Sequence, residues 1–507
     1  MLGLDPTPGS DYSPSNLGGG WDWGNAVNWQ NILCASGLAV GAAGCHTPPV
    51  YESAALPRFL VDPAPAVEAT PVADELQAVP KADRPIVTLP DAVRECVLNN
   101  MRLKAAEEQI RTAQADYITE SLIPNCQLMA DAQLLPVSVI NFDNQAGPPQ
   151  YDALLTVPID WFVFGKRVAA RAAAQLNVDV AQATFADQIR REIALTVDGF
   201  YDALEADFAV KLAEKDIDAL RELEKTAKEF GKTGVEVQRV QLAVLDAQRE
   251  LRKRRAAAET TKSKLQARMG RPPDTPDFVV RGTLTLQASA PALSVSQAWA
   301  LAEQNRPDLI SARRSIAAAE AGITRERKRG LPQMSITTGA DYQDQMRITG
   351  FRNAWLWTVA VNTTLPFTDR NQGKILLAES FSRSARANLG AATADARAEV
   401  EQAVAEYTEA VNGVTGEDVA SLRTAREVRD ATVEAYRKGT KDLLDALDSE
   451  RAYRDRVRNT LGNLTDYWQA LNRLNAAVGQ RVLTAKEAEK DTFLDDTNLK
   501  TVKPPAK

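Results

Sequence analysis

The sequence repeats one pattern twice, and the two copies lie about 206 residues apart. The stretch Asn99–Leu103 in the first copy corresponds to Asn305–Leu309 in the second. Each copy then runs through a Pro, two alternating segments, a second Pro and a Gly-Lys that opens a long helical tract. A tandem of two half-units rarely forms an enzyme pocket and more often forms a pseudo-symmetric wall, barrel or solenoid.

Composition excludes several classes of protein. The net charge of the 507 residues is −7, whereas a nucleic-acid-binding protein needs a basic face. The single histidine, His46, leaves little room for histidine-based catalysis or metal binding, and the four cysteines lack zinc-ligand spacing. No nucleophile–base pair or phosphate loop is recognisable. We therefore expect no enzyme activity and no cofactor.

The N-terminal region has the character of an export segment. A short run of small and apolar residues, 32–44, ends in Ala-Ala-Gly before Cys45, as in a bacterial lipobox. This pattern predicts that residues 1–45 are a signal segment and that Cys45 receives a lipid. The alternative is a free or buried cysteine in a tail. Residues 46–88 are rich in Pro and Ala and are expected to form a tether.

The residue pattern of each half then predicts one helix, two strands and a pair of long antiparallel helices. Apolar residues recur at helical spacing from Phe185 to Leu212, which indicates one buried face of a very long helix. The heptad-like spacing from Leu461 to Val478 indicates a coiled-coil seam. In the first half we expect helices at 91–122, 166–230 and 235–269 and strands at 126–140, 151–163 and 278–286. In the second half we expect helices at 294–328, 374–437 and about 440–479 and strands at 333–348 and 354–367.

The strands raise a closure problem. At about 10–14 residues they are long enough to cross a bilayer when tilted. Lipid does not tolerate an open sheet edge, because unpaired backbone groups there cost several kcal/mol each. Four strands are too few to close a membrane barrel, whose smallest known examples have about eight. If the strands span a membrane, several chains must share one barrel.

These features resemble the TolC-type outer membrane efflux proteins, over about residues 89–480. The second hairpin tip carries the strongest piece of the resemblance: Tyr436, three residues on Gly439, and then a Leu-Asp-x-Leu-Asp-like segment ending at Asp448. The Asn-x-Pro-Asp-Leu at 305–309 and the Leu-Pro before each strand pair are also typical of the family. The first tip, 230–234, departs from the pattern.

The resemblance implies a mainly α fold with β: tandem long helical hairpins, four membrane strands per chain and a trimeric α/β barrel. It divides the chain into two efflux repeats, 89–290 and 291–480, and a flexible tail, 481–507. The implied function is the passive outer-membrane exit duct of a tripartite efflux or type I secretion system, gated at its periplasmic tip. Its implied partners are two further copies of the chain, a periplasmic adaptor, an inner-membrane pump and outer-membrane lipid. The alternative is a periplasmic coiled-coil scaffold or adaptor without a membrane barrel.

Some residues are candidates for specific roles. Tyr436, Lys441, Asp445 and Asp448 are expected to form the gate, although the two aspartates also suit a helix N-terminus. Trp355 and Trp357 share one strand face and are expected at the membrane interface, with a core position as the alternative. The basic run 325–329 precedes the second strand pair and is expected either at the inner membrane surface or simply in solvent.

Overall fold

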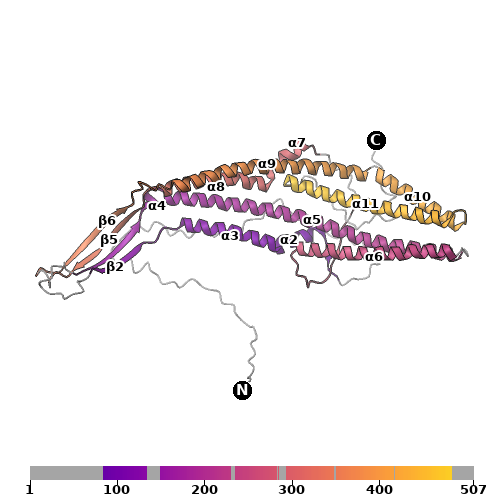
Figure 1. Ribbon diagram of the computed structural model, residues 1–507, viewed down its shortest axis with the longest axis horizontal. Coiled ribbons are helices and arrows are strands. Elements are labelled where there is room, and N and C mark those ends of the chain that lie inside the picture. Colours follow the sequence, from indigo (N-terminus) through magenta and orange to yellow (C-terminus); the bar gives the residue numbers. More distant parts are fainter. Residues whose placement is uncertain are drawn as a thin grey trace, which may run out of the picture. The chain divides into compact units, whose positions relative to one another are not determined.

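The computed structural model describes residues 84–133, 149–229, 234–282, 284, 293–346, 350–415 and 417–481 (Figure 1). The chain divides into two compact units, Met1–Glu52 and Ser53–Lys507, and every described residue belongs to the second. Of the helices in this described part, none is both long enough and apolar enough to cross a bilayer. Cys45 and the tail 482–507 lie outside the described residues.

In the described part of the first half there are four helices of 11 to 64 residues and one helix of only four residues. A two-residue strand, β1 (Ile86–Val87), precedes α2 (Leu89–Asn99) and α3 (Met101–Ser121). The strands β2 (Gln127–Gln133) and β3 (Gln150–Pro158) follow, and then α4 (Asp160–Val163). The long hairpin consists of α5 (Lys166–Glu229) and α6 (Gly234–Arg268). With 64 residues, α5 spans about 96 Å at 1.5 Å per residue.

The second half repeats this order after β4 (Val279–Val280), which pairs in parallel with β1. It contains α7 (Val295–Asn305), α8 (Pro307–Arg329), β5 (Met334–Gln343) and β6 (Ala354–Thr363). The long hairpin consists of α9 (Gln372–Thr415), α10 (Glu417–Arg437) and α11 (Leu443–Val478). The predicted architecture of tandem helical hairpins with four strands is confirmed.

Two expected helices are wrong in detail, because each is divided in two. The helix expected at 91–122 breaks at Asn100, whose extended backbone lets its side chain accept a hydrogen bond from Arg102 N at 2.8 Å. The helix expected at 294–328 breaks at Arg306, because Pro307 disfavours the helical conformation in the residue before it. The helix expected at 374–437 is present as α9 and α10, and residue 416 between them lies outside the described residues.

The strand expected at 151–163 is also wrong at its end, because α4 occupies residues 160–163. The Trp161 indole nitrogen donates to the Pro158 carbonyl at 2.8 Å, which closes the chain into a turn. The strands expected at 333–348 and 354–367 are shorter than predicted. Part of the strand expected at 126–140 lies outside the described residues. Of the strand expected at 278–286, only Val279–Val280 is a strand, and residues 283, 285 and 286 lie outside the described residues.

The four long strands form one antiparallel sheet in the order β2-β3-β5-β6. This sheet adjoins the N-terminal ends of the long helices, because β3 leads through α4 into α5 and β6 leads into α9 (Figure 1). Lys166, the first residue of α5, links the two halves by donating to the Pro332 carbonyl at 2.8 Å. Both edges of the sheet, β2 and β6, have no neighbouring strand within the described part of the chain.

The main apolar core lies where α5, α9 and α11 meet. Tyr201 of α5 stacks on Trp468 of α11, with ring centroids 5.6 Å apart. The predicted seam of α11 is confirmed, since all six of its members are buried: Leu461, Leu464, Trp468, Leu471, Leu474 and Val478. The helices of the two halves therefore share one core rather than forming separate bodies.

Candidate functional site

The two faces of the four-stranded sheet differ in polarity. One face carries aspartate, glutamine, threonine and asparagine side chains. The opposite face carries Leu128, Tyr151, Leu155, Ile336, Tyr342, Trp355, Trp357, Val359 and Val361. Residues on the two faces alternate along each strand, so that one sheet presents a polar surface and an apolar surface.

Three aspartates form a row across the polar face. Asp131 of β2 pairs in register with Asp152 of β3, which pairs in turn with Asp341 of β5. The Gln150 amide donates to one Asp152 carboxylate oxygen at 2.7 Å, and the Thr358 hydroxyl donates to Asp341. Like charges at adjacent positions repel each other, so these hydrogen bonds help to hold the row in place.

Sequence reasoning missed this row, although the sequence contains a signal for it. Each aspartate stands between two apolar residues near the loop end of its strand: Ala130–Ala132, Tyr151–Ala153 and Ala340–Tyr342. Comparing the strands with one another, rather than one at a time, would have found the row.

Trp355 and Trp357 lie on the apolar face, at the start of β6. Their exposed fractions are 75% and 66%, so the alternative of a core position within this chain is wrong. The Tyr342 ring lies 5.0 Å from the Trp355 ring, centroid to centroid, and forms a cluster of aromatic side chains near the loop end of the sheet. Exposed aromatic side chains also lie at the helix end of the sheet, at Phe162 and Phe367.

The second hairpin tip joins both halves of the chain. The Tyr436 side chain is fully buried and packs with Leu220 and Leu223 of α5, Val240 and Val244 of α6, and Leu443 and Ala446 of α11. Burial raises the pKa of Tyr436, and the nearby Glu236 raises it further. A carboxylate oxygen of Glu236 is itself buried without a hydrogen-bond partner among the described residues. Tyr436 therefore ties the two hairpins together inside one chain.

The other predicted gate residues lie on the surface of the tip. The Lys441 amino group lies 3.7 Å from the Asp445 carboxylate one turn further on, and both side chains are about half exposed. Asp448 is also exposed. The structure thus brings Lys441 and Asp445 together, while Tyr436 lies in the apolar cluster. Residues 230–233 of the first tip lie outside the described residues.

A buried ionic cluster occupies the junction between α7 and α8. The Arg306 guanidinium is almost fully buried and donates to the Ala477 carbonyl at 3.0 Å, to Asp308 at 2.7 Å and to Glu399 at 2.7 Å. Arg190 of α5 donates to the neighbouring Ala476 carbonyl at 2.7 Å. Two guanidinium groups thus complement the negative C-terminal end of α11. Burial alone would raise the pKa of Asp308, yet Arg306 lowers it below its usual value.

The corresponding junction of the first half is built around an amide. The Asn100 side chain donates to the Arg268 carbonyl at the end of α6 at 3.2 Å and to the buried Glu192 carboxylate at 3.1 Å. Cys96 lies beside them, and burial raises the pKa of its thiol, which makes the thiol unreactive. This cluster is structural.

Carboxylates also line the contact between α5 and α11. Asn472 donates to Asp198, and Gln469 donates to Asp202. Burial raises the pKa of Asp198 and of Glu205, and it raises the pKa of Asp216 to about 6. Even so, no group of three or more His, Cys, Asp or Glu side chains in the described part of the chain is arranged to hold a metal ion.

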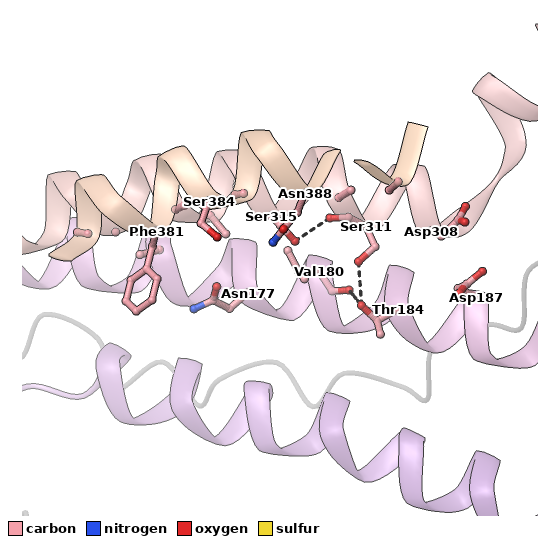
Figure 2. Close-up of a pocket in the computed structure, with 18 of the residues that line it drawn as sticks. Asn177, Val180, Thr184, Asp187, Asp308, Ser311, Ser315, Phe381, Ser384 and Asn388 are labelled. Carbon is pink, nitrogen blue, oxygen red and sulfur yellow. Dashed lines mark hydrogen bonds between the residues drawn. The ribbon is translucent and has the colours of Figure 1, made fainter. Parts of the chain in front are cut away.

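A groove of about 650 Å³ runs between α5, α8 and α9 (Figure 2). Its walls are mostly alanine, serine and asparagine, and Figure 2 shows the Thr184 and Ser311 hydroxyls joined by a hydrogen bond of 2.8 Å. Asp187 and Asp308 at one end of the groove are already paired with arginines. The groove therefore contains small polar groups but no combination of side chains suited to covalent chemistry.

The protein family, the relative and the solved structures that this chain resembles agree with one another. Residues 299–480 match the outer membrane efflux protein family. The chain is 24% identical over 401 residues to the cobalt-zinc-cadmium resistance protein CzcC of Cupriavidus metallidurans, which covers 78% of this chain and 90% of that protein. It resembles the structure of the outer-membrane channel OprN, with a TM-score of 0.62 at 17% identity over 77% of this chain and 90% of the other. It also resembles the Campylobacter jejuni CmeC outer membrane channel, with a TM-score of 0.62 at 16% identity over 78% and 87%.

Proposed function

We propose that this chain is a TolC-type outer membrane efflux protein and the exit duct of a tripartite efflux or type I secretion system; the match of residues 299–480 to the outer membrane efflux protein family and the likeness to CzcC and OprN support this. It is a passive trimeric channel in the outer membrane. Proteins of this family form trimers and work within efflux systems. We further propose that its partners are a periplasmic adaptor and an inner-membrane pump, and that residues 89–290 and 291–480 are its two repeats.

The observation that carries this function is the amphipathic sheet with two open edges. Its apolar face suits lipid and its polar face suits water, as in a membrane barrel whose lumen is hydrated. Strands β2 and β6 leave unpaired backbone groups that lipid would not tolerate. Pairing β6 of one chain with β2 of the next removes all edges when three chains close into a ring of twelve strands.

Paired substitutions on adjacent residues of β6 test the barrel. Val359 lies on the apolar face and Ala360 on the polar face of the same strand. An arginine facing lipid at the midplane costs about 2–4 kcal/mol, whereas one facing the lumen is tolerated. Val359→Arg should therefore abolish outer-membrane insertion and single-channel conductance, while Ala360→Arg should retain both.

The periplasmic scaffold without a barrel remains the competing function, and the same pair of variants distinguishes it. A scaffold would tolerate Val359→Arg as well as Ala360→Arg, and it would sediment as a soluble protein. Mass measurement in detergent is a second test: a monomer that keeps its full strand content would also contradict the duct.

We propose that the tip formed by Tyr436, Lys441, Asp445 and Asp448 is the gate. Asp445 and Asp448 lie one turn apart on α11, so a trimer would place rings of three carboxylates around the narrow end. Carboxylates at about 4 Å repel each other by about 1 kcal/mol per pair even in water, so the rings favour bound cations that hold the tip shut. The burial of Tyr436 between both hairpins supports a role for this residue in holding them together.

Channel recordings test the gate. Asp445→Ala with Asp448→Ala should weaken block by divalent cations without loss of the trimer, whereas Asp218→Ala with Glu229→Ala, on exposed positions of α5, should not. Tyr436→Phe with Lys441→Ala should raise the resting conductance. Unchanged cation block in the first variant would mean that the two aspartates only complement the N-terminus of α11.

The aspartate row supports a proposal about cargo. In a trimer, Asp131, Asp152 and Asp341 would contribute a ring of carboxylates to the lumen, and such a ring favours cations over anions. The name of the relative CzcC refers to cobalt, zinc and cadmium, which are cations. Replacing all three aspartates with asparagine should lower the potassium-to-chloride permeability ratio by about tenfold. An unchanged ratio would exclude the row as a selectivity element.

Two features are proposed to fix the protein in the membrane. Cys45 would carry a lipid, which mass spectrometry of the mature N-terminus tests; residues upstream of Cys45 in the membrane-bound form would refute it.

Trp355 and Trp357 would lie at the outer membrane–water interface, a position that their exposure on the apolar face supports. Their fluorescence should be quenched by lipid-attached quenchers in reconstituted vesicles.

A further inference from the structure

A second pocket lies where the helices meet the helix end of the sheet. It has a volume of about 450 Å³ and is formed by the last turn of α8 and by the segment between β6 and α9. Two arginines, Arg327 and Arg370, lie on its wall together with Leu331, Leu365 and Phe367. The pocket therefore combines positive charge with an apolar surface.

The apolar wall continues the apolar face of the sheet. Along β6 the outward side chains are at odd positions, from Trp355 to Val361, and they are 62–75% exposed. Leu365 and Phe367 follow at the same spacing and are 64% and 75% exposed. Beyond the strand the chain turns, since the Phe367 N–H donates to the Leu365 carbonyl at 2.9 Å, and exposed apolar side chains lead from β6 to the pocket at the level where the sheet ends.

The two arginines retain hydrogen-bonding capacity. The Arg370 side chain makes one hydrogen bond among the described residues, from its Nε to the Pro366 carbonyl at 3.2 Å, so its two terminal amino groups are available. Arg327 lies 3.2 Å from the Glu379 carboxylate through one amino group only. The nearby Asp369 carboxylate accepts from the Asn371 backbone N–H. The two nearby carboxylates, Glu379 and Asp369, therefore already have an ion-pair or hydrogen-bond partner.

The pocket is held in shape by close backbone contacts. A Cβ on Gly330 would lie 2.5 Å from the Arg370 carbonyl oxygen, so α8 and the returning segment approach each other as closely as glycine allows. The Asn371 side chain, on a residue with a φ of 63°, donates to the Glu326 carbonyl at 2.8 Å. The pocket is therefore preformed rather than created by a ligand.

We propose that this pocket binds the headgroup of an anionic phospholipid in the periplasmic leaflet, one per chain. Guanidinium groups pair with phosphate oxygens through two parallel hydrogen bonds, and the acyl chains would lie along Leu365, Phe367 and the apolar stripe of β6. In the first half, Arg167 near the same end of the sheet stacks over Trp161 and donates to the Ser121 carbonyl. The proposal rests on the membrane-spanning sheet of the proposed function.

Lipid titration of the detergent-purified trimer, followed by native mass spectrometry, tests the proposal. Wild type should bind up to three phosphatidylglycerol molecules in preference to phosphatidylcholine. Arg327→Gln with Arg370→Gln should weaken phosphatidylglycerol binding by roughly 30-fold, from the loss of two basic groups beside an anionic lipid. The matched control is Arg313→Gln with Arg386→Gln, which removes two exposed arginines of α8 and α9 away from the pocket and should bind lipid like wild type.

The outcomes separate the pocket from the duct. Unchanged phosphatidylglycerol binding in the Arg327/Arg370 variant, in a trimer that still conducts, would overturn the pocket and leave the duct intact. Complete displacement of phosphatidylglycerol by inorganic phosphate would overturn the lipid in favour of a free phosphate site. If the double variant does not assemble, the single Arg370→Gln variant, which removes no ion pair, must still show weakened lipid binding. Failure of wild type itself to form a conducting trimer would instead contradict the proposed function.

Discussion

In the first half of the chain, the Asn100 amide and the buried Glu192 carboxylate fill the junction between α2 and α3. In the second half, the same junction is filled by the Arg306 guanidinium, with Asp308 and Glu399 around it. The backbone is alike in both places: the residue at the junction is extended, and its side chain reaches a carbonyl at the C-terminal end of a returning helix. The repeat preserves the backbone geometry, whereas the side chain at the junction is a neutral amide in one copy and a charged guanidinium in the other, with carboxylates beside both.

This difference predicts unequal tolerance of substitution. An amide that loses its partners leaves polar groups unsatisfied, whereas a buried arginine that is removed leaves carboxylates without a counter-charge. The second half should therefore depend on its junction more than the first half does. Three measurements break or sharpen this comparison.

Removing the buried guanidinium should have the largest effect. Arg306→Met should destabilise the helical part by about 3–5 kcal/mol, because Asp308 and the end of α11 lose their buried partner. Asn100→Ala should cost about 1–3 kcal/mol, because only hydrogen bonds are lost. Thermal unfolding of the purified protein, followed by circular dichroism, gives both values. Equal losses would mean that the guanidinium at the second junction is no more important than the amide at the first.

A second contrast lies further along the long helices. Asp216 of α5 is buried against α11, facing Arg454, Arg458, Glu450 and Asp455, whereas Thr424 of α10 stands at the same place in the repeat. Burial raises the pKa of Asp216 from 3.8 to about 6. A carboxyl with a raised pKa in the folded state contributes stability that is fully present below pH 3.8 and is lost as the pH rises through about 6.

Asp216→Asn should therefore stabilise the protein at pH 7.5 by up to about 3 kcal/mol and should flatten the pH dependence of unfolding between about pH 4 and 7. The matched control is Asp218→Asn, because the Asp218 side chain is 76% exposed and its loss should change neither quantity. A variant that is no more stable than wild type at pH 7.5 would contradict a buried, ionised Asp216.

The smallest expected effect concerns the two glycines that end the returning helices. Gly270 and Gly479 both have positive φ, at 72° and 80°, so alanine at either site should cost about 1–2 kcal/mol from backbone conformation alone. A Cβ at Gly270 would also lie 2.4 Å from the Asn99 carbonyl oxygen, whereas at Gly479 the nearest atom is at 3.1 Å. Gly270→Ala should therefore lower the melting temperature more than Gly479→Ala. The reverse order would mean that the ionic junction is the more tightly packed of the two.

Much of the fold could be predicted from the sequence, because long helices and amphipathic strands leave periodic patterns. The α11 seam and the apolar face of α5 are examples, since each residue type repeats at the spacing of its element. The helix breaks at Asn100 and Arg306 were missed because local spacing continues across them. Pro307 was the available signal in the second half, and in the first half the break depends on the hydrogen bond of one side chain.

The site was harder to predict than the fold. The aspartate row depends on the register between strands that are far apart in sequence, and a single strand does not reveal its register. The burial of Tyr436 depends on packing against α5 and α6, more than 190 residues upstream. Motif similarity drew attention to the tip, but it did not distinguish the side chain in the apolar core from those on the surface.

The open edges β2 and β6 determine how the ring would close, and they also determine how a mutation would behave when damaged and intact chains are made together. Each joint of a closed ring would use β6 of one chain and β2 of the next, so a chain with a damaged edge spoils any ring that it enters. If damaged and intact chains are made in equal amounts and mix at random, only roughly one trimer in eight contains intact chains alone. Edge substitutions that leave the shared helical core folded should therefore be dominant, whereas substitutions that prevent the helices from folding should be recessive.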